Sequence, residues 1–112
     1  MEEIKVGDFV RTKEGIIDKI DAFNINTNIY HCENGLCIDK ENKIAVALKD
    51  IKHSKHIIDL VECGDYVNGK YVKEINQYKD GKSIIALIGI IDEQDIKTIL
   101  TKEQFEQNSY KV

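Results

Sequence analysis

The sequence predicts a mainly β fold, either a small SH3-like barrel or two packed hairpin units, with a short C-terminal helix. Three observations predict it: a short motif occurs twice, β-branched segments alternate with glycine-containing turns, and a helix-capping pattern stands near the end. The length of 112 residues is typical of one domain. We therefore expect a single domain over residues 1–112, with 1–52 and 53–112 as candidate sub-units.

The repeated motif reads VGDFV at residues 6–10 and CGDYV at residues 63–67. Each copy is followed by a turn and a β-branched segment, which predicts a hairpin. Asn68 and Gly69 predict a type I′ turn in the second hairpin, because both residue types tolerate positive φ. The first hairpin needs a longer turn, with Gly15 in the left-handed conformation. Two packed hairpins and a paired binding site would both produce the repeat, and we favour the structural interpretation.

Further strands are expected where β-branched residues lie between turn residues. These segments are residues 28–31, 35–38, 43–48, 57–61, 82–91 and 96–100. Thr101 and Gln104 form a capping-box pattern, which predicts a helix over residues 101–108. We expect Phe105 of this helix to face inward.

The charge of the chain argues against non-specific nucleic-acid binding. Its formal net charge is −4, and Arg11 is its only arginine, whereas binding to phosphates needs a concentrated basic patch. A weakly acidic surface suits a basic protein surface instead. The longest apolar run, residues 84–91, is too short to span a bilayer, so no membrane partner is expected.

The N-terminus and the cysteines predict a cytoplasmic protein. The first residues are acidic and lack the apolar region of a secretory signal. The three cysteines do not form a disulfide framework, and free thiols suit a reducing compartment.

Three stretches of the chain carry a resemblance to a known group. KVGDFVRTKEGIIDKI, KHSKHIIDLVECGDYVNGKYV and DIKTILTKEQFE resemble small, uncharacterised accessory proteins of phages and prophages of Gram-positive bacteria. Residues 22–47 depart most from that pattern. The resemblance implies a phage or prophage accessory protein that acts in the host cytoplasm, where such proteins often bind host machinery, defence factors included. It implies no catalytic or binding residue.

The cysteines and histidines leave a zinc site open. Cys32, Cys37, His53 and His56 follow the spacing C-x4-C-x15-H-x2-H, which is loose in the first pair and short in the second. The alternative, which we favour, is that the cysteines are small apolar strand residues and the histidines lie in a polar loop. His31 adjoins Cys32, but neighbours on a strand point to opposite faces, so they cannot form a dyad. We therefore expect no metal, cofactor or catalytic residue.

Aromatic and acidic residues supply the candidate binding site. Phe9 and Tyr66 occupy equivalent motif positions and are expected in the core, whereas Tyr71 and Tyr78 are candidates for an exposed face, where tyrosine is a favoured binding anchor. The candidate protein-binding residues are Tyr71, Tyr78, Asp92, Glu93, Asp95, Glu103 and Glu106.

These observations predict a non-enzymatic protein-binding module. The resemblance extends this prediction to a phage-encoded inhibitor of a host defence factor, similar to an anti-CRISPR protein, that acts by steric occlusion of a host protein. The alternatives are a small β-barrel associated with nucleic acid and a sponge for a small signalling nucleotide. The sequence leaves the oligomeric state open.

Overall fold

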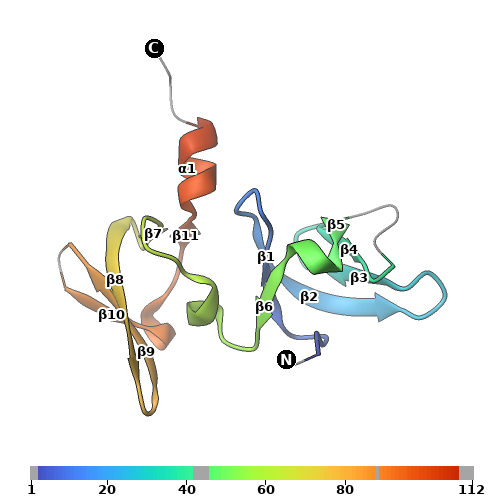
Figure 1. The fold of residues 1–112 in the computed structure, drawn as a ribbon, viewed down its shortest axis with the longest axis horizontal. Helices are drawn as coiled ribbons and strands as arrows, with labels where there is room; N and C mark the ends of the chain where they lie inside the picture. Colours follow the sequence, from blue (N-terminus) through green and yellow to red (C-terminus); the bar gives the residue numbers. More distant parts are fainter. Residues whose placement is uncertain (1–2, 42–45, 88, 109–112) are drawn as a thin grey trace. The chain divides into compact units, whose positions relative to one another are not determined.

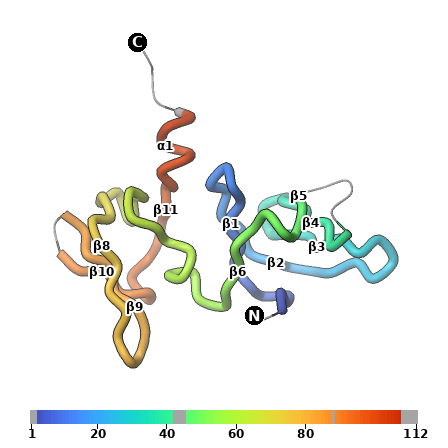
Figure 2. Tube along the Cα trace, viewed as in Figure 1, coloured from blue at the N-terminus to red at the C-terminus, as the bar shows by residue number. Residues whose placement is uncertain are grey.

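The computed structural model describes residues 3–41, 46–87 and 89–108. The chain divides into two compact units, Met1–His56 and Ile57–Val112. The fold is mainly β in both units (Figures 1 and 2). In the described ranges, no helix has the length and apolar character that a membrane crossing requires.

The first unit is a six-stranded sheet with the order β5-β4-β3-β2-β1-β6. Neighbouring strands are antiparallel, except that β4 and β5 are parallel. Its elements are β1 (Phe9–Arg11), β2 (Ile17–Asn24), β3 (Ile29–Cys32), β4 (Cys37–Asp39), β5 (Val46–Ala47), the 3₁₀ helix η1 (Leu48–Asp50) and β6 (Lys52–Ser54).

The second unit is a five-stranded antiparallel sheet with the order β10-β9-β8-β7-β11. A short helix follows its last strand, as predicted. Its elements are η2 (Ile57–Leu60), β7 (Tyr66–Val67), β8 (Lys70–Tyr78), β9 (Gly81–Ala86), β10 (Ile90–Asp92), η3 (Glu93–Asp95), β11 (Ile99–Leu100) and α1 (Lys102–Asn108).

Both units follow one strand plan. In each, the first strand pairs with the second and with the last strand, and a 3₁₀ helix precedes the last strand (Figure 1). Each long second strand also has an irregularity at the same point, between Ile20 and Ala22 in β2 and between Val72 and Glu74 in β8. Apart from β5, which has no counterpart, the second unit therefore repeats the first in strand order and in register.

The Gly-Asp pair makes the same turn in both units. Gly7 and Gly64 each have φ +97°, a conformation that glycine adopts without a steric penalty. The Gly7 N–H donates to the Ile20 carbonyl at 2.9 Å, and the Gly64 N–H donates to the Val72 carbonyl at 3.0 Å. The two copies of the motif thus open two separate sheets, one in each unit.

The two cores are built from equivalent positions. Within each unit, the register aligns a buried residue of every main strand with its counterpart in the other unit. The aligned pairs are Val10 and Val67, Ile20 and Val72, Tyr30 and Ile84, Cys32 and Ala86, and Ile38 and Ile91.

The turns and the helix agree with the sequence prediction. Asn68 and Gly69 have φ values of 53° and 77°, as a type I′ turn requires, and Gly15 has φ 85°. Thr101 Oγ1 accepts the Gln104 N–H at 3.3 Å, while the Gln104 side chain accepts the Thr101 N–H at 3.4 Å. The predicted capping box is confirmed.

Several predicted strands differ from the structure in extent or type. Residues 82–91 form two strands, β9 and β10, because Gly89 at φ 89° allows a tight turn between them. Residues 57–60 form η2, which the Val61 N–H closes by donating to the Ile58 carbonyl. Of the strand predicted at 43–48, Val46 and Ala47 form β5 and Leu48 begins η1, while residues 43–45 lie outside the described residues.

Candidate functional site

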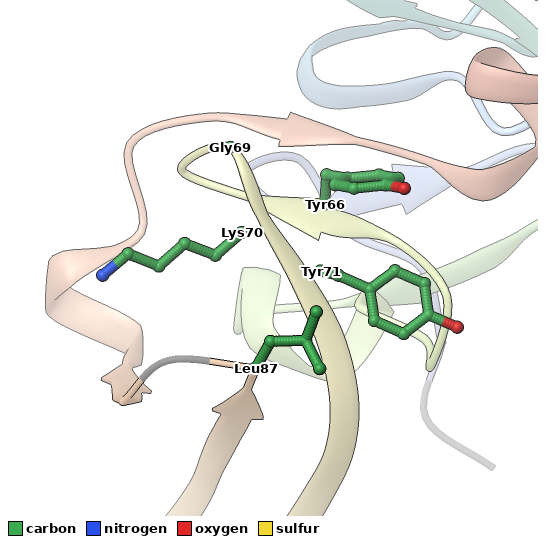
Figure 3. Close-up of a pocket in the computed structure, with 5 residues that line it drawn as sticks. All are labelled: Tyr66, Gly69, Lys70, Tyr71 and Leu87. Atoms are coloured by element: carbon green, nitrogen blue, oxygen red, sulfur yellow. The ribbon is translucent and has the colours of Figure 1, made fainter.

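A shallow pocket of about 500 Å³ lies in the second unit (Figure 3). Its lining comes from β7, the turn after it, the start of β8 and the chain just beyond β9. The side chains of Tyr71 and Leu87 lie close together in Figure 3, whereas the Lys70 side chain points away from them. The lining residues are Tyr66, Gly69, Lys70, Tyr71 and Leu87.

Three aromatic rings continue this surface; we call Phe105, Tyr66 and Tyr71 the aromatic row. The Tyr66 and Tyr71 rings are 5.6 Å apart and meet edge to face, while the Tyr66 and Phe105 rings are 5.0 Å apart. Phe105 is 47% exposed and Tyr71 is 40% exposed, and the neighbouring Leu87 is 69% exposed. The second unit therefore exposes a continuous apolar surface to solvent. Folding does not require the side chains at such exposed positions to be apolar.

The backbone holds this row in place. Tyr66 and Tyr71 are register partners in β7 and β8, so their side chains lie on the same face of the sheet. The buried Asp65 carboxylate accepts the Lys102 N–H at 2.9 Å, at the start of α1. Lys102 Nζ also lies 2.8 Å from a Glu62 carboxylate oxygen. These contacts fix the helix that carries Phe105 beside Tyr66.

The equivalent surface of the first unit is charged instead. The Glu33 N–H donates to the Lys19 carbonyl just as the Leu87 N–H donates to the Tyr71 carbonyl, so Lys19 corresponds to Tyr71 and Glu33 to Leu87. The Lys19 ammonium lies 5.4 Å from the ring centre of Phe9, the counterpart of Tyr66. The same fold therefore does not need the apolar side chains that the second unit has here.

Asp18 in the first unit occupies the position that corresponds to Lys70 in the second. Asp18 pairs with Val10 as Lys70 pairs with Val67. Its buried carboxylate accepts the N–H groups of Asn34 and Leu36, at distances from 3.2 to 3.4 Å. These bonds hold Asn34 and Leu36 of the β3–β4 loop against β2, whereas Lys70 is exposed.

The two predicted tyrosines lie at opposite ends of β8. Tyr71 is exposed, as the sequence analysis expected, and it lines the pocket. Tyr78 is also exposed, but it lies beside the turn to β9, where its hydroxyl accepts a hydrogen bond from the Asn76 side chain at 3.3 Å. The structure therefore brings only Tyr71 to the pocket.

The predicted acidic residues divide into three groups. Asp92 and Glu93 are engaged in the fold, since Asp92 accepts the Ser83 hydroxyl at 3.0 Å and Glu93 accepts the Ile58 N–H at 3.3 Å. Asp95 is exposed at the end of η3, with its backbone carbonyl bonded to Asn68. Glu103 and Glu106 lie in α1 with Phe105 and are the predicted acids nearest to the aromatic row in sequence.

Sequence reasoning missed Leu87 and expected three aromatic residues to be more buried than they are. Phe105 was expected to face inward and is instead half-exposed, because it stacks on Tyr66 rather than entering the core. Phe9 and Tyr66 do occupy equivalent positions, but both are only partly buried and lie outside the two core clusters. The available sequence signal was the identity of their strand partners. Lys19 pairs with Phe9 and Tyr71 pairs with Tyr66, so each partner lies on the same outer face as the aromatic ring.

The four residues of the zinc hypothesis have separate surroundings. Cys32 is buried in the first core, where desolvation raises the pKa of its thiol to about 12. His53 Nδ1 lies 3.2 Å from the Asp8 carboxylate, and His56 is exposed. Cys37 contacts His31, which the sequence offers as a further possible ligand. Within residues 3–41, 46–87 and 89–108, no group of three or more His, Cys, Asp or Glu side chains could hold a metal ion.

Comparison with known proteins adds no relative to this description. No family model, curated protein or solved structure matches the chain.

Proposed function

We propose that the chain is a non-enzymatic protein-binding module that uses the aromatic row and the adjoining pocket of its second unit. The observation that carries this proposal is the difference between two equivalent faces. The first unit has the charged residues Lys19 and Glu33 on this face, while the second leaves Tyr71 and Leu87 exposed at the matching positions. Exposed aromatic clusters of this kind are typical binding anchors.

The lining favours an apolar side chain of a protein over an anionic ligand. Tyr66, Tyr71 and Leu87 supply apolar surface, and the Lys70 side chain points away from the latter two. A single-stranded nucleic acid or a signalling nucleotide would need a cation near the stacking rings for its phosphate. Glu103 and Glu106, in the same helix as Phe105, favour a partner with basic residues beside its apolar anchor.

The resemblance to phage accessory proteins favours a bacterial host protein as the partner. A module without chemistry of its own acts by covering a surface that the partner needs. We therefore propose steric occlusion of a host protein, such as a defence factor, in the host cytoplasm.

The test is affinity capture from a nuclease-treated lysate of a Gram-positive host, followed by titration of the captured protein with purified variants. Tyr71→Ala is expected to weaken binding by about 30-fold, the loss of about 2 kcal/mol that marks a central aromatic anchor. Leu87→Ser should weaken it as well. Tyr78→Ala is the matched control, since it removes another exposed tyrosine of β8, and should leave the affinity unchanged.

Two outcomes would overturn the proposal. One is a partner whose affinity is the same for Tyr71→Ala, Leu87→Ser and the unaltered protein. The other is capture that disappears when the lysate is treated with nuclease, which would favour nucleic acid instead.

A further inference from the structure

A thiol–imidazole pair lies on the outer face of the first unit. His31 in β3 and Cys37 in β4 are register partners across the strand pair. His31 Nδ1 and Cys37 Sγ are 3.6 Å apart, and the thiol also lies 3.8 Å from the Gly35 carbonyl oxygen. A base within hydrogen-bond reach of a thiol is the arrangement that activates a cysteine nucleophile.

The other two cysteines provide a comparison within the same chain. Cys32 is buried, and the resulting desolvation raises the pKa of its thiol to about 12, so it remains a neutral thiol. Cys63 is exposed, but it belongs to the second unit, and the imidazole of the pair belongs to the first. Cys37 combines partial exposure with a neighbouring imidazole.

The face on which the pair lies has room for a modification. Tyr30 and Ile38, the register partners beside His31 and Cys37, point into the core, and both are buried. Since successive side chains of a strand alternate, His31 and Cys37 point the other way. A group attached to Cys37 would therefore extend from the sheet without displacing core residues.

We propose that Cys37 is a site of reversible thiol modification by low-molecular-weight disulfides, with His31 as its base. His31, protonated on Nε2, accepts the Cys37 thiol proton on Nδ1. The sulfur attacks one sulfur of the disulfide, the new S–S bond forms as the old one breaks, and the leaving thiolate takes the proton from the imidazolium. The products are a mixed disulfide at Cys37 and one free thiol, so oxidant and reductant are both supplied by the exchange.

The probe is glutathione disulfide, added to the intact native protein at neutral pH. The rate of modification at each cysteine is read by mass spectrometry of peptides from quenched samples. We expect Cys37 to react about tenfold faster than Cys63, and Cys32 to react only when the protein unfolds. His31→Gln should reduce the rate at Cys37 to that of Cys63 and leave Cys63 itself unchanged.

The control variant is Cys63→Ser, which should leave the rate at Cys37 unchanged. His31 is exposed, so His31→Gln is expected to keep the fold, and circular dichroism checks this. Faster reaction at Cys63 than at Cys37 would overturn the proposal. An equal rate at Cys37 with and without the imidazole would overturn it as well.

Discussion

Asp8 and Asp65 perform the same local task and two different longer-range tasks. Each carboxylate accepts the N–H of the residue three positions earlier, Lys5 or Glu62, and so closes the turn at the Gly-Asp pair. Asp8 also contacts the His53 ring in β6, whereas Asp65 accepts the first N–H of α1. A buried carboxylate needs such partners, because an unpaired charge in the interior is costly. Folding therefore requires the Gly-Asp motif in both units, while the second hydrogen-bond partner of the aspartate differs between the units.

Cys32 makes the stability of the first unit sensitive to alkaline pH. Burial raises its pKa to about 12 in the folded chain, while an unfolded thiol has a pKa of about 8.5. The folded state therefore keeps its proton where the unfolded state releases it. This stabilising contribution is complete below the unfolded pKa and is lost progressively as pH rises from about 8.5 towards 12.

We predict that Cys32→Ala removes this part of the alkaline destabilisation. The second unit has Ala86 at the equivalent core position, so alanine suits the site. At pH 7 the variant should lose about 1 kcal/mol of unfolding free energy, because it lacks the buried sulfur. Urea unfolding at about pH 10 should show this deficit closed or reversed, because the unaltered protein has by then lost about 2 kcal/mol of its own stability. A difference that is the same at both pH values would contradict the prediction.

At the scale of elements, the Asn68 side chain connects the β7–β8 turn to the segment before β11. Its amide nitrogen donates to the Asp95 carbonyl at 2.8 Å, and its oxygen accepts the N–H groups of Lys97 and Thr98 at 2.8 and 3.0 Å. Those two N–H groups are directed to a side chain rather than to a strand. This explains why the strand predicted at 96–100 is reduced to Ile99–Leu100.

We predict that Asn68→Gly destabilises the second unit by about 1–3 kcal/mol, because it removes these three hydrogen bonds while glycine keeps the turn conformation. Asn68→Ala should cost about 1 kcal/mol more, since alanine at φ 53° adds backbone strain. Urea unfolding measures both values. Equal stability of the glycine variant and the unaltered protein would show that the side-chain bonds contribute nothing net.

The sequence predicted those elements whose signals are local. Asn68 with Gly69 and Thr101 with Gln104 each specify a turn or a cap within a few residues, and both predictions are confirmed. The break between β9 and β10 was missed, because Ile84 and Ile91 both face the core and the apolar run continues across the turn. The contact of His31 with Cys37 was missed because it depends on the register between two strands.

At the scale of the whole chain, one fold plan carries two different surfaces. The core positions are equivalent and similar in character, while Lys19 corresponds to Tyr71 and Glu33 to Leu87 on the outer face. The repeated motif predicted two hairpins, whereas the structure repeats a longer strand plan in each unit. The candidate site could not be found in this way, because it becomes visible only when the register aligns the two faces.

Separate cores predict that each unit loses its structure by itself. Ile38 and Ile91 are buried at equivalent positions, one in each core. Ile38→Ala and Ile91→Ala should each cost about 2–5 kcal/mol, because each leaves a cavity in its own core. We predict that hydrogen exchange accelerates in residues 3–56 of the first variant and in residues 57–108 of the second, while the other unit keeps its protection.

The matched controls are Ile25→Ala and Ile90→Ala, which truncate isoleucines that are exposed in the first and second units. Both should leave exchange unchanged, since their side chains lose little surface on folding. If one core variant accelerates exchange equally in both units, the two cores belong to one cooperative unit. If each variant affects only its own half, the aromatic surface of the second unit can be altered without cost to the first. Hydrogen exchange in the first unit then serves as an internal reference for folding when the binding variants Tyr71→Ala and Leu87→Ser are compared with the unaltered protein.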